Sequence, residues 1–435
     1  MNSESLAKIT DAVILKSSDI DISDFSTDTR TIKSGDIYLP LKGENFDGEN
    51  FIEDALSKGA AGYFTTSGKI FDNAKVILKV ENTQEAYLKI ALSKRLEVNP
   101  KVIGVTGSSG KTTTKEMIAS VCSQKFKTQK TQLNHNNEVG FCQTIMSMPY
   151  DTEVLILEMG MRGLGQIEVL SKYSKPDITV ISNVGTAHIG ILGSKENIAK
   201  AKCEIVKYQK TDGIFIAPDD DLIRKTVDFS GTKIFTGKFN ILEQKIGYTK
   251  FEYKNQVWEL NLEGEYNVCD AIFAIETGYA LNMEYKEIFE GLKQYKPIEK
   301  RWEVINKNGY NIIKDCYNAN PDSMKSALKT IFELYPNSVI VLGDMGELGE
   351  NSNVYHREVG EFIKSRNYDY QKLITVGNLA KEISEVNGNS VNFSDNIDAA
   401  EYILKNVQKN STVFLKASRS MKFEQIAEII GQEKW

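Results

Sequence analysis

The sequence predicts an α/β protein of three domains, covering residues 1–97, 98–297 and 298–435. Its 435 residues are enough for two to four domains. In the second and third parts of the chain, short apolar runs alternate with helical stretches, which is typical of a parallel sheet covered by helices. Pro100 marks the first join, and the polar segment 295–301 marks the second.

The elements expected in each domain follow from local periodicity and composition. In the first domain, strand-like segments at 36–41 and 61–65 are mixed with helical segments at 50–58 and 83–96. In the second domain, apolar strands are expected at 102–105, 154–157, 178–181 and 213–216, followed by an antiparallel stretch at 251–262 and a helix at 267–281. The third domain is expected to be a small doubly wound sheet, with strands at 312–313, 338–342, 372–376 and 413–415 and helices at 323–334 and 356–365.

Composition excludes several classes of protein. Hydrophobic residues make up 41% and charged residues 26% of the chain, as in soluble globular proteins. No apolar run reaches the roughly 18 residues that a membrane span needs, and the N-terminus lacks the apolar core of a secretory signal. The five cysteines are scattered without CxxC spacing, which predicts a reduced, cytoplasmic protein. The net charge of −6 argues against general nucleic-acid binding, so anionic substrates would need positive charge concentrated at their site.

Residues 105–116 read VTGSSGKTTTKE and follow an apolar run. A glycine-rich turn between a strand and a helix aims backbone N–H groups at a phosphate and places a lysine over it. The strict pattern GxxxxGK[ST] has glycine at the position of Val105, whereas this chain has it at Gly107. We expect Lys111 to reach the β- and γ-phosphates of ATP and Thr112 to hold Mg²⁺; the alternative is a plain strand-to-helix turn. The predicted ATP-binding residues of the loop are Thr106, Gly107, Ser108, Ser109, Gly110, Lys111, Thr112 and Thr113.

Two further residues of the second domain are candidate metal ligands because each follows an apolar strand. A carboxylate at such a strand end, here Glu158, points into the ligand crevice of a parallel sheet, although it could be a solvated strand-end residue. A neutral imidazole, here His188, suits a divalent metal, although a lone histidine is more often structural.

Lys202 is expected to lie on a buried helical face. In the segment 196–206 it shares that face with Ile198 and Ile205, whereas Lys200 and Lys207 fall on another. Desolvation lowers the pKa of a lysine, and the neutral amine can capture CO₂ as a carbamate that binds a second Mg²⁺. The alternative, which the sequence alone favours, is a lysine whose ammonium group reaches solvent.

Two polar clusters follow strands of the third domain. Residues 314–324 read KDCYNANPDSM, and residues 343–349 read GDMGELG. Because both lie at the same edge of one predicted sheet, they could hold a ribose or a peptide. Either cluster could also be a plain turn.

Taken together, these motifs resemble the Mur ligase family over all three parts of the chain. Residues 106–114 resemble its ATP loop, and residues 136–140 (NNEVG) resemble its NNxxG segment, followed by phenylalanine where the family usually has proline. Glu158, His188 and Lys202 match its metal-binding glutamate, histidine and carbamylated lysine.

The resemblance extends to the second join and the third domain. Residues 264–267 (GEYN) resemble the family's GxHN segment with tyrosine in place of histidine, and Asn267 is expected to hold adenine. Arg301 matches the arginine that reaches the γ-phosphate. Asp315 matches a nucleotide-binding aspartate, although Lys314 precedes it where the family commonly has another aspartate.

Substrate-binding residues are also implied by the resemblance. Residues 317–324 and 342–349 resemble the branch of the family that adds D-alanyl-D-alanine, and residues 26–48 resemble its UDP-binding domain, with Glu49 where a histidine is usual. The implied substrate residues are Ser26, Thr27, Arg30, Lys42, Asn136, Asn137, Tyr317, Asn318 and Asn320.

The fold implied by the resemblance is a central P-loop ATPase domain flanked by a small N-terminal α/β domain that binds the UDP substrate and a C-terminal Rossmann-like domain. The implied activity is ATP-dependent joining of D-alanyl-D-alanine to UDP-N-acetylmuramoyl-tripeptide through an acyl phosphate, in peptidoglycan precursor synthesis. Two Mg²⁺ ions and carbamylated Lys202 are implied, with Lys111, His188, Lys202 and Arg301 as catalytic residues. We expect a cytoplasmic monomer whose domains close about hinges near residues 98 and 298. Two alternatives remain: another ligase of this superfamily, such as a folylpolyglutamate synthetase, and a P-loop motor or regulatory NTPase.

Overall fold

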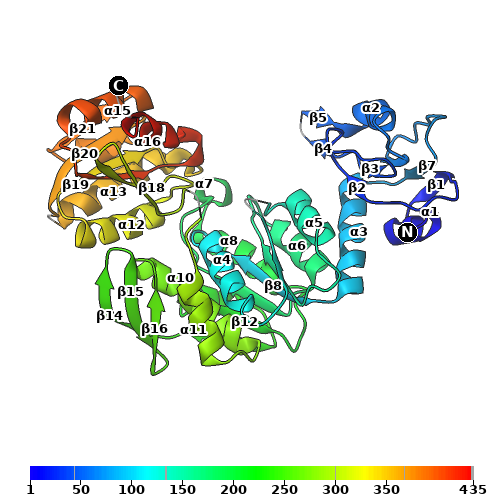
Figure 1. Ribbon diagram of the computed structural model, residues 1–435, viewed down its shortest axis with the longest axis horizontal. Coiled ribbons are helices and arrows are strands. Elements are labelled where there is room, and N and C mark those ends of the chain that lie inside the picture. Colours follow the sequence, from blue (N-terminus) through cyan, green and yellow to red (C-terminus); the bar gives the residue numbers. More distant parts are fainter. Residues whose placement is uncertain (44, 133–134, 299, 367, 433–435) are drawn as a thin grey trace.

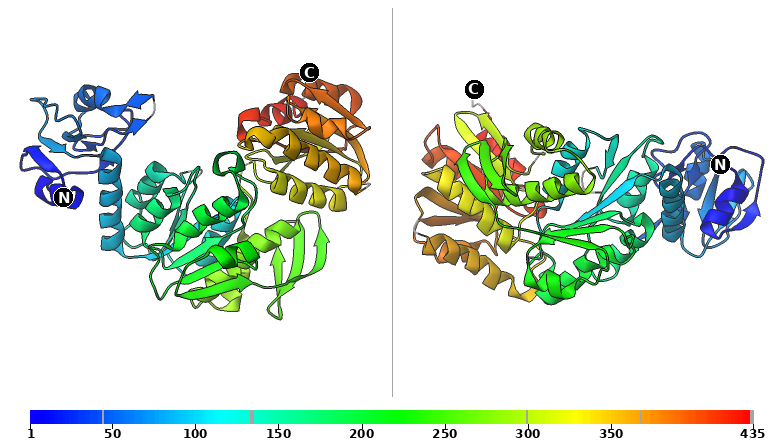
Figure 2. Two further views of the ribbon diagram at one scale, coloured as in Figure 1. Left: turned by 180° about the vertical axis from the view of Figure 1, so that it is seen from behind. Right: turned by 90° about the horizontal axis from the view of Figure 1, so that it is seen from below.

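The computed structural model describes residues 1–43, 45–132, 135–298, 300–366 and 368–432. Figure 1 shows three bodies in a row, with the first and last at opposite ends of a central one. The views from behind and from below in Figure 2 show the same separation, and each body has a sheet of its own. The predicted α/β fold is therefore confirmed. No helix among the described residues combines the length and apolar character needed to cross a membrane.

The N-terminal domain is built on a five-stranded sheet of order β1-β7-β6-β3-β2. Its middle strand β6 is buried along its whole length, whereas the strand predicted at 36–41 is reduced to β3, which ends before Pro40. Proline lacks the backbone donor that a ladder needs. The elements are α1 (Ser3–Thr10), β1 (Val13–Lys16), β2 (Phe25–Ser26), β3 (Ile37–Tyr38), β4 (Lys42–Gly43), β5 (Phe46–Asp47), η1 (Gly48–Phe51), α2 (Ile52–Ser57), β6 (Gly62–Thr65), β7 (Val76–Lys79) and α3 (Thr83–Val98).

The central domain contains a six-stranded parallel sheet of order β13-β12-β11-β8-β10-β9. Its inner strands form at the predicted apolar runs because helices cover both faces. The predicted antiparallel stretch is also present, in the sheet β14-β15-β16. The elements are β8 (Lys101–Thr106), α4 (Lys111–Cys122), β9 (Thr128–Lys130), α5 (Glu138–Met146), β10 (Val154–Glu158), α6 (Gln166–Ser174), β11 (Ile178–Ile181), α7 (Ile189–Leu192), α8 (Lys195–Cys203), η2 (Glu204–Val206), β12 (Ile214–Pro218), α9 (Asp221–Thr226), β13 (Thr232–Thr236), β14 (Asn240–Lys245), β15 (Tyr248–Tyr253), β16 (Gln256–Leu260), α10 (Glu265–Ala280) and α11 (Tyr285–Gln294).

The C-terminal domain has a six-stranded sheet of order β17-β18-β22-β19-β20-β21, parallel except for β17. Sequence reasoning missed β17 and β21, which form the two edges and are only partly buried. The elements are β17 (Glu303–Lys307), β18 (Tyr310–Asp315), α12 (Pro321–Leu334), β19 (Ser338–Gly343), η3 (Gly349–Asn351), α13 (Ser352–Ser365), β20 (Tyr370–Val376), α14 (Lys381–Glu385), β21 (Ser390–Phe393), α15 (Asn396–Asn406), β22 (Thr412–Lys416), η4 (Arg419–Met421) and α16 (Glu424–Ile430).

Helix α3 fastens the N-terminal domain to the central domain. It packs against α5 and α6 as well as against α1, and one apolar core contains both Leu78 of the N-terminal sheet and Leu155 of the central sheet. Arg95 on α3 is only 1% exposed. Its Nε donates to the carbonyl of Ser174 at 2.9 Å, and its Nη2 lies 3.8 Å from Asp177 Oδ2. A hinge at residue 98 would have to break this packing.

We predict that Arg95→Met destabilises the junction by about 2–3 kcal/mol, because it leaves the Ser174 carbonyl without its donor while keeping an apolar side chain of similar length. The measurement is the urea midpoint of unfolding, followed by tryptophan fluorescence. Lys89→Met on the same helix is the control: Lys89 pairs with Asp11 at 2.9 Å on the surface, and such pairs contribute about 0–1 kcal/mol. Equal midpoints for the two variants would show that Arg95 does not hold the junction.

Candidate active site

The carboxyl ends of two parallel sheets face one cavity of about 1000 Å³. Thr106 and Glu158 end β8 and β10 of the central sheet, and Asp315 and Lys416 end β18 and β22 of the C-terminal sheet. Ligands of such sheets bind at this edge. The residues predicted to bind ATP and the metal line this cavity, and so do the predicted substrate residues Asn136, Asn137, Tyr317, Asn318 and Asn320. Of the cluster 343–349, Glu347 lines it.

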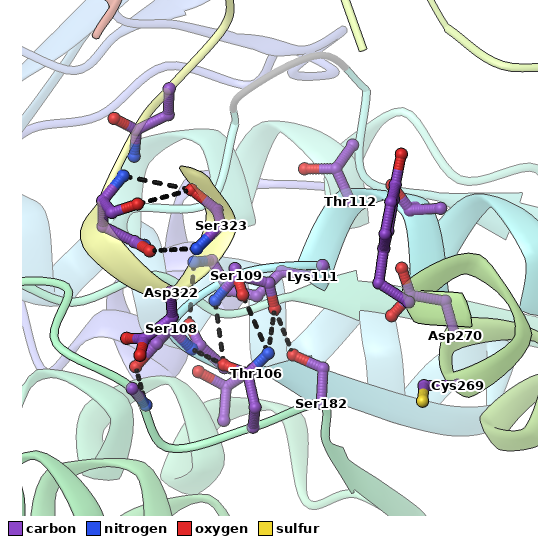
Figure 3. Close-up of a pocket in the computed structure, with 18 of the residues that line it drawn as sticks. Thr106, Ser108, Ser109, Lys111, Thr112, Ser182, Cys269, Asp270, Asp322 and Ser323 are labelled. Atoms are coloured by element: carbon purple, nitrogen blue, oxygen red, sulfur yellow. Dashed lines mark hydrogen bonds between the residues drawn. The ribbon is translucent and has the colours of Figure 1, made fainter. Parts of the chain in front are cut away.

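Two close contacts explain the glycines of the phosphate loop, and Figure 3 shows the two side chains concerned, Ser182 and Asp270. A Cβ at Gly107 would lie 1.9 Å from Ser182 Oγ. Gly110 has a φ of +77°, and a Cβ there would lie 2.6 Å from Asp270 Oδ1. The loop therefore needs glycine at 107 for steric reasons. The strict pattern has glycine at position 105, and here the loop forms with Val105 at that position.

Asn183 fixes the phosphate loop by hydrogen bonds, although sequence reasoning did not place it in the site. The N–H groups of Ser108 and Ser109 donate to Asn183 Oδ1 at 3.1 and 3.0 Å. Lys111 begins α4, and its Nζ donates to the carbonyl of Gly107 at 2.8 Å. This bond turns the ammonium group over the mouth of the loop, where a phosphate would lie.

Glu158 is a buried carboxylate held by neighbouring side chains. It is 2% exposed, Asn136 Nδ2 donates to its Oε1 at 3.0 Å, and Lys115 Nζ lies 3.6 Å from its Oε2. Burial opposes ionisation, but Lys115, Lys111 and Arg301 outweigh it and lower the pKa of Glu158. Among the described residues, Oε2 has no hydrogen-bond donor.

Lys202 lies on the face of α8 where it was predicted. Lys202 is 1% exposed and Ile198 and Ile205 are buried, whereas Lys200 and Lys207 are exposed. Burial lowers the pKa of Lys202 well below its usual value, and the nearby Lys111 lowers it further. The lowered pKa favours the neutral amine of this side chain, which lines the cavity.

The predicted metal ligands are chemically suited to Mg²⁺ but incomplete by themselves. No three His, Cys, Asp or Glu side chains within the described part of the chain are grouped to hold a metal ion. Glu158 supplies one free carboxylate oxygen and Thr112 a hydroxyl, and Mg²⁺ normally completes its shell with phosphate oxygens and water. A carbamate on Lys202 would add the missing negative charge.

Polar contacts join the central domain to the C-terminal domain beside the cavity. The backbone N–H and the hydroxyl of Thr186 both donate to Asp322 Oδ2 at 2.8 Å. His188 Nδ1 lies 2.8 Å from Glu347 Oε2, and the closeness of His188 lowers the pKa of Glu347. Asp322 and Glu347 lie in the two polar clusters that the sequence singled out, but neither was predicted as a site residue.

The C-terminal wall carries a cation that the sequence did not reveal. Lys416 Nζ donates to Asp315 Oδ2 and, at 3.4 Å, to the carbonyl of Asn318. Opposite this pair, the Arg301 guanidinium lies 4.1 Å above the centroid of the Tyr317 ring. The only sequence signal for Lys416 was its position at the end of an apolar strand.

Two groups of predicted residues have other roles or places. Asn137 and Asn320 line the cavity but also cap α5 and α12, accepting from Gly140 N at 3.0 Å and Ser323 N at 2.9 Å. The predicted uridine-binding residues lie in the N-terminal domain and do not line this cavity: Ser26, Thr27, Arg30 and Lys42.

Comparisons with known proteins follow the same division of the chain. Three family models match: "Mur ligase family, catalytic domain" at residues 21–104, "Mur ligase middle domain" at 105–278, and "Mur ligase, glutamate ligase domain" at 300–419. The curated UDP-N-acetylmuramoyl-tripeptide–D-alanyl-D-alanine ligase of Bacillus subtilis is 35% identical over 422 residues, which are 93% of this chain and 92% of that protein. The chain belongs to the Mur ligase family.

Solved Mur ligase structures share its whole fold. The crystal structure of MurF from Acinetobacter baumannii superposes with a TM-score of 0.92 at 28% identity and covers 99% of both chains. A MurF ligase from Thermotoga maritima, solved in complex with ADP, has a TM-score of 0.86 at 28% identity and covers 94% of this chain and 97% of its own. The Mur ligase resemblance first seen in the motifs is thus confirmed over the full length.

The buried carboxyl group of Asp270 leads to a prediction about how the stability of the fold depends on pH. Burial raises the pKa of Asp270 from 3.8 to about 7, while the hydrogen bond from Thr114 Oγ1 at 2.8 Å offsets part of the rise. Between pH 4 and pH 7 the folded protein therefore keeps a proton that the unfolded chain has released. The favourable contribution of Asp270 to the free energy of unfolding is complete only below pH 4 and is lost as pH rises through 7. Asp270→Asn should be more stable than wild type at pH 8, and this gain should shrink by roughly 2–3 kcal/mol at pH 5.

The control for this prediction is Asp177→Asn, which should show the opposite trend. Burial raises the pKa of Asp177, but hydrogen bonds from Lys210 and from the backbone of Val102 outweigh it and lower the pKa overall. The stabilising contribution of Asp177 to the free energy of unfolding is therefore present at neutral pH and lost on acidification. Thermal unfolding midpoints at pH 5 and pH 8 measure both variants, and parallel pH trends in the two would contradict the assignment for Asp270.

Proposed function

We propose that this Mur ligase joins D-alanyl-D-alanine to UDP-N-acetylmuramoyl-tripeptide with ATP as the energy source, in the synthesis of peptidoglycan precursors. The curated relatives carry the name of this reaction. The observation that carries the proposal is the single cavity in which the phosphate loop with Lys111 faces Arg301 and the 315–320 cluster. An enzyme that only hydrolysed ATP would not need a second polar wall of this kind.

The chemistry begins with a poor electrophile. An oxygen of the tripeptide's terminal carboxylate attacks the γ-phosphorus of ATP, the bond to ADP breaks, and an acyl phosphate forms. The amine of D-alanyl-D-alanine then attacks the acyl carbon, loses a proton and expels phosphate, which leaves the amide. Both ATP and the carboxylate are anionic, so Lys111 and Arg301 offset their repulsion and the charge that develops during transfer.

The metal assignment is part of the proposal. Thr112 and Glu158 would hold one Mg²⁺, and Glu158, His188 and the carbamate of Lys202 would hold a second. When bound, the ions supply Lewis-acid stabilisation of the phosphoryl oxygens. Supporting observations are Glu158 Oε2, which has no hydrogen-bond donor among the described residues, and the buried Lys202, whose pKa is lowered.

Protection from water completes the proposed mechanism. An acyl phosphate hydrolyses if water reaches it, so the C-terminal domain must cover the cavity during the reaction. The contacts of Thr186 with Asp322 and of His188 with Glu347 hold that domain against the phosphate-loop side.

We further propose that the enzyme acts as a cytoplasmic monomer; its five cysteines are free thiols, which is consistent with a reducing compartment.

The direct test is release of ADP with UDP-N-acetylmuramoyl-tripeptide in the presence and absence of D-alanyl-D-alanine. We expect steady ADP release only when both substrates are present, because the amine is needed to discharge the acyl phosphate. L-alanine or L-glutamate alone should not replace the dipeptide. Efficient addition of a single amino acid would indicate another branch of the family, and equal ATP turnover without substrates would indicate a regulatory NTPase.

Lys202 generates a second prediction. Lys202→Ala should lose most amide-forming activity, by at least about 100-fold, because the carbamate ligand and its charge are lost. A short carboxylic acid should restore part of that activity by filling the vacated space. The matched control is Lys200→Ala two positions away on the exposed face of α8, which should stay near wild type. An active Lys202→Ala enzyme, or a crippled Lys200→Ala enzyme, would overturn the carbamate assignment.

A further inference from the structure

A second buried carboxylate, Glu263, lies where the central and C-terminal domains meet, outside the lining of the cavity. It is 1% exposed and precedes α10. Trp302 Nε1 donates to its Oε1 at 2.7 Å, the Tyr335 hydroxyl donates to the same oxygen, and the N–H of Gly247 donates to its Oε2 at 2.9 Å. Both carboxylate oxygens are therefore satisfied, and the two side-chain donors come from beyond the second join.

Trp302 immediately follows Arg301 in the chain. Lys300 and Trp302 have φ values of +64° and +54°, so Arg301 sits between two residues in the left-handed region, which each cost about 1 kcal/mol unless the surroundings fix them. The Trp302 ring is 3% exposed and packs against Tyr266 and Phe414, with centroids 5.9 and 5.7 Å away. The side chain of Trp302 therefore fixes the backbone on one side of Arg301.

Arg301 has few contacts that could orient it by itself. Its guanidinium stacks on Tyr317, and its buried Nε has no acceptor among the described residues. The same guanidinium lines the cavity together with Lys111 and Glu158, and its charge acts on both. An arginine held so loosely depends on its backbone for its direction.

The main chain of Glu263 also reaches the nucleotide side. Its carbonyl accepts from Asn267 Nδ2 at 2.5 Å, and Asn267 lines the cavity as the predicted adenine residue. One residue thus contacts both the segment that carries Arg301 and the residue expected at the base. A shift of Glu263 would disturb both ends of a bound nucleotide.

We propose that Glu263 is a positioning residue that, by holding Trp302, directs Arg301 toward the γ-phosphate of the bound nucleotide. The inference rests on the proposed function only for the role of Arg301 at that phosphate. It does not depend on the identity of the amine or of the UDP substrate. Glu263 touches no substrate itself and acts through Trp302.

The test compares affinities for ADP and for the non-hydrolysable ATP analogue AMP-PNP, measured by isothermal titration calorimetry in Mg²⁺ buffer. Trp302→Phe removes the Nε1 donor next to Arg301. Tyr335→Phe removes a donor to the same carboxylate oxygen from the end of α12, away from Arg301. Arg301→Met is the reference for complete loss of the γ-phosphate contact.

We expect Trp302→Phe to lower the preference for AMP-PNP over ADP by about tenfold, because small misplacements of a charged contact have effects of this size. Tyr335→Phe should leave the preference within about twofold of wild type, even if it lowers the unfolding midpoint as much. A purely structural role for Glu263 would lower the midpoint in both variants and leave the preference unchanged in both, which would overturn the proposal.

One further variant and the Arg301→Met reference keep the outcome decisive. If Trp302→Phe does not fold, Glu263→Gln keeps the shape and one acceptor oxygen but weakens both side-chain bonds, and it should lower the preference in the same way; an unchanged preference there overturns the proposal. If Arg301→Met itself keeps the wild-type preference, the proposed role of Arg301 fails first, and the positioning role of Glu263 fails with it.

Discussion

An excess of positive charge around one buried carboxylate is the constraint on which the site depends. Lys111, Lys115 and Arg301 act on Glu158 at the edge of the central sheet. Two unit charges 4 Å apart interact by about 4 kcal/mol at an effective dielectric constant of 20, and Glu158 alone does not balance the charge of three cations. The lowered pKa values of Lys111 and Lys202 express this imbalance together with burial. A polyphosphate supplies the missing charge, which explains how a chain of net charge −6 can take an anionic substrate.

The two domain junctions serve this site differently. At α3, the buried contacts of Arg95 lie away from the cavity and fix only the position of the N-terminal domain. At the second junction, Asp322, Glu347 and Arg301 belong both to the junction and to the cavity lining, so a movement there changes the chemistry directly. The separation of the predicted uridine residues from the phosphate loop fits a long substrate, because the reacting carboxylate lies at the far end of the tripeptide from the UDP group.

The sequence predicted those features that depend on local pattern. Strands β8, β10 and β11 are continuous apolar runs buried on both faces, and the residues that follow them could be assigned to one sheet edge. The edge strand β17 lacks such a run because it is only partly buried. Asp270 and Glu263 could not be predicted, because each acquires its role from partners far away in the chain, the phosphate loop for Asp270 and Trp302 for Glu263.

Two residues that depart from the family pattern have packing or hydrogen-bond partners in this structure. Tyr266, in place of a histidine, packs its ring against Trp302 and so supports the residue that Glu263 holds. Glu49, also in place of a histidine, accepts hydrogen bonds from Thr66 and Ser67. Burial opposes its ionisation, but these bonds lower the pKa of Glu49 to about 2. That carboxylate is charged and already accepts from internal donors, so it would repel a diphosphate, and the proposed uridine site in the N-terminal domain would have to use other groups.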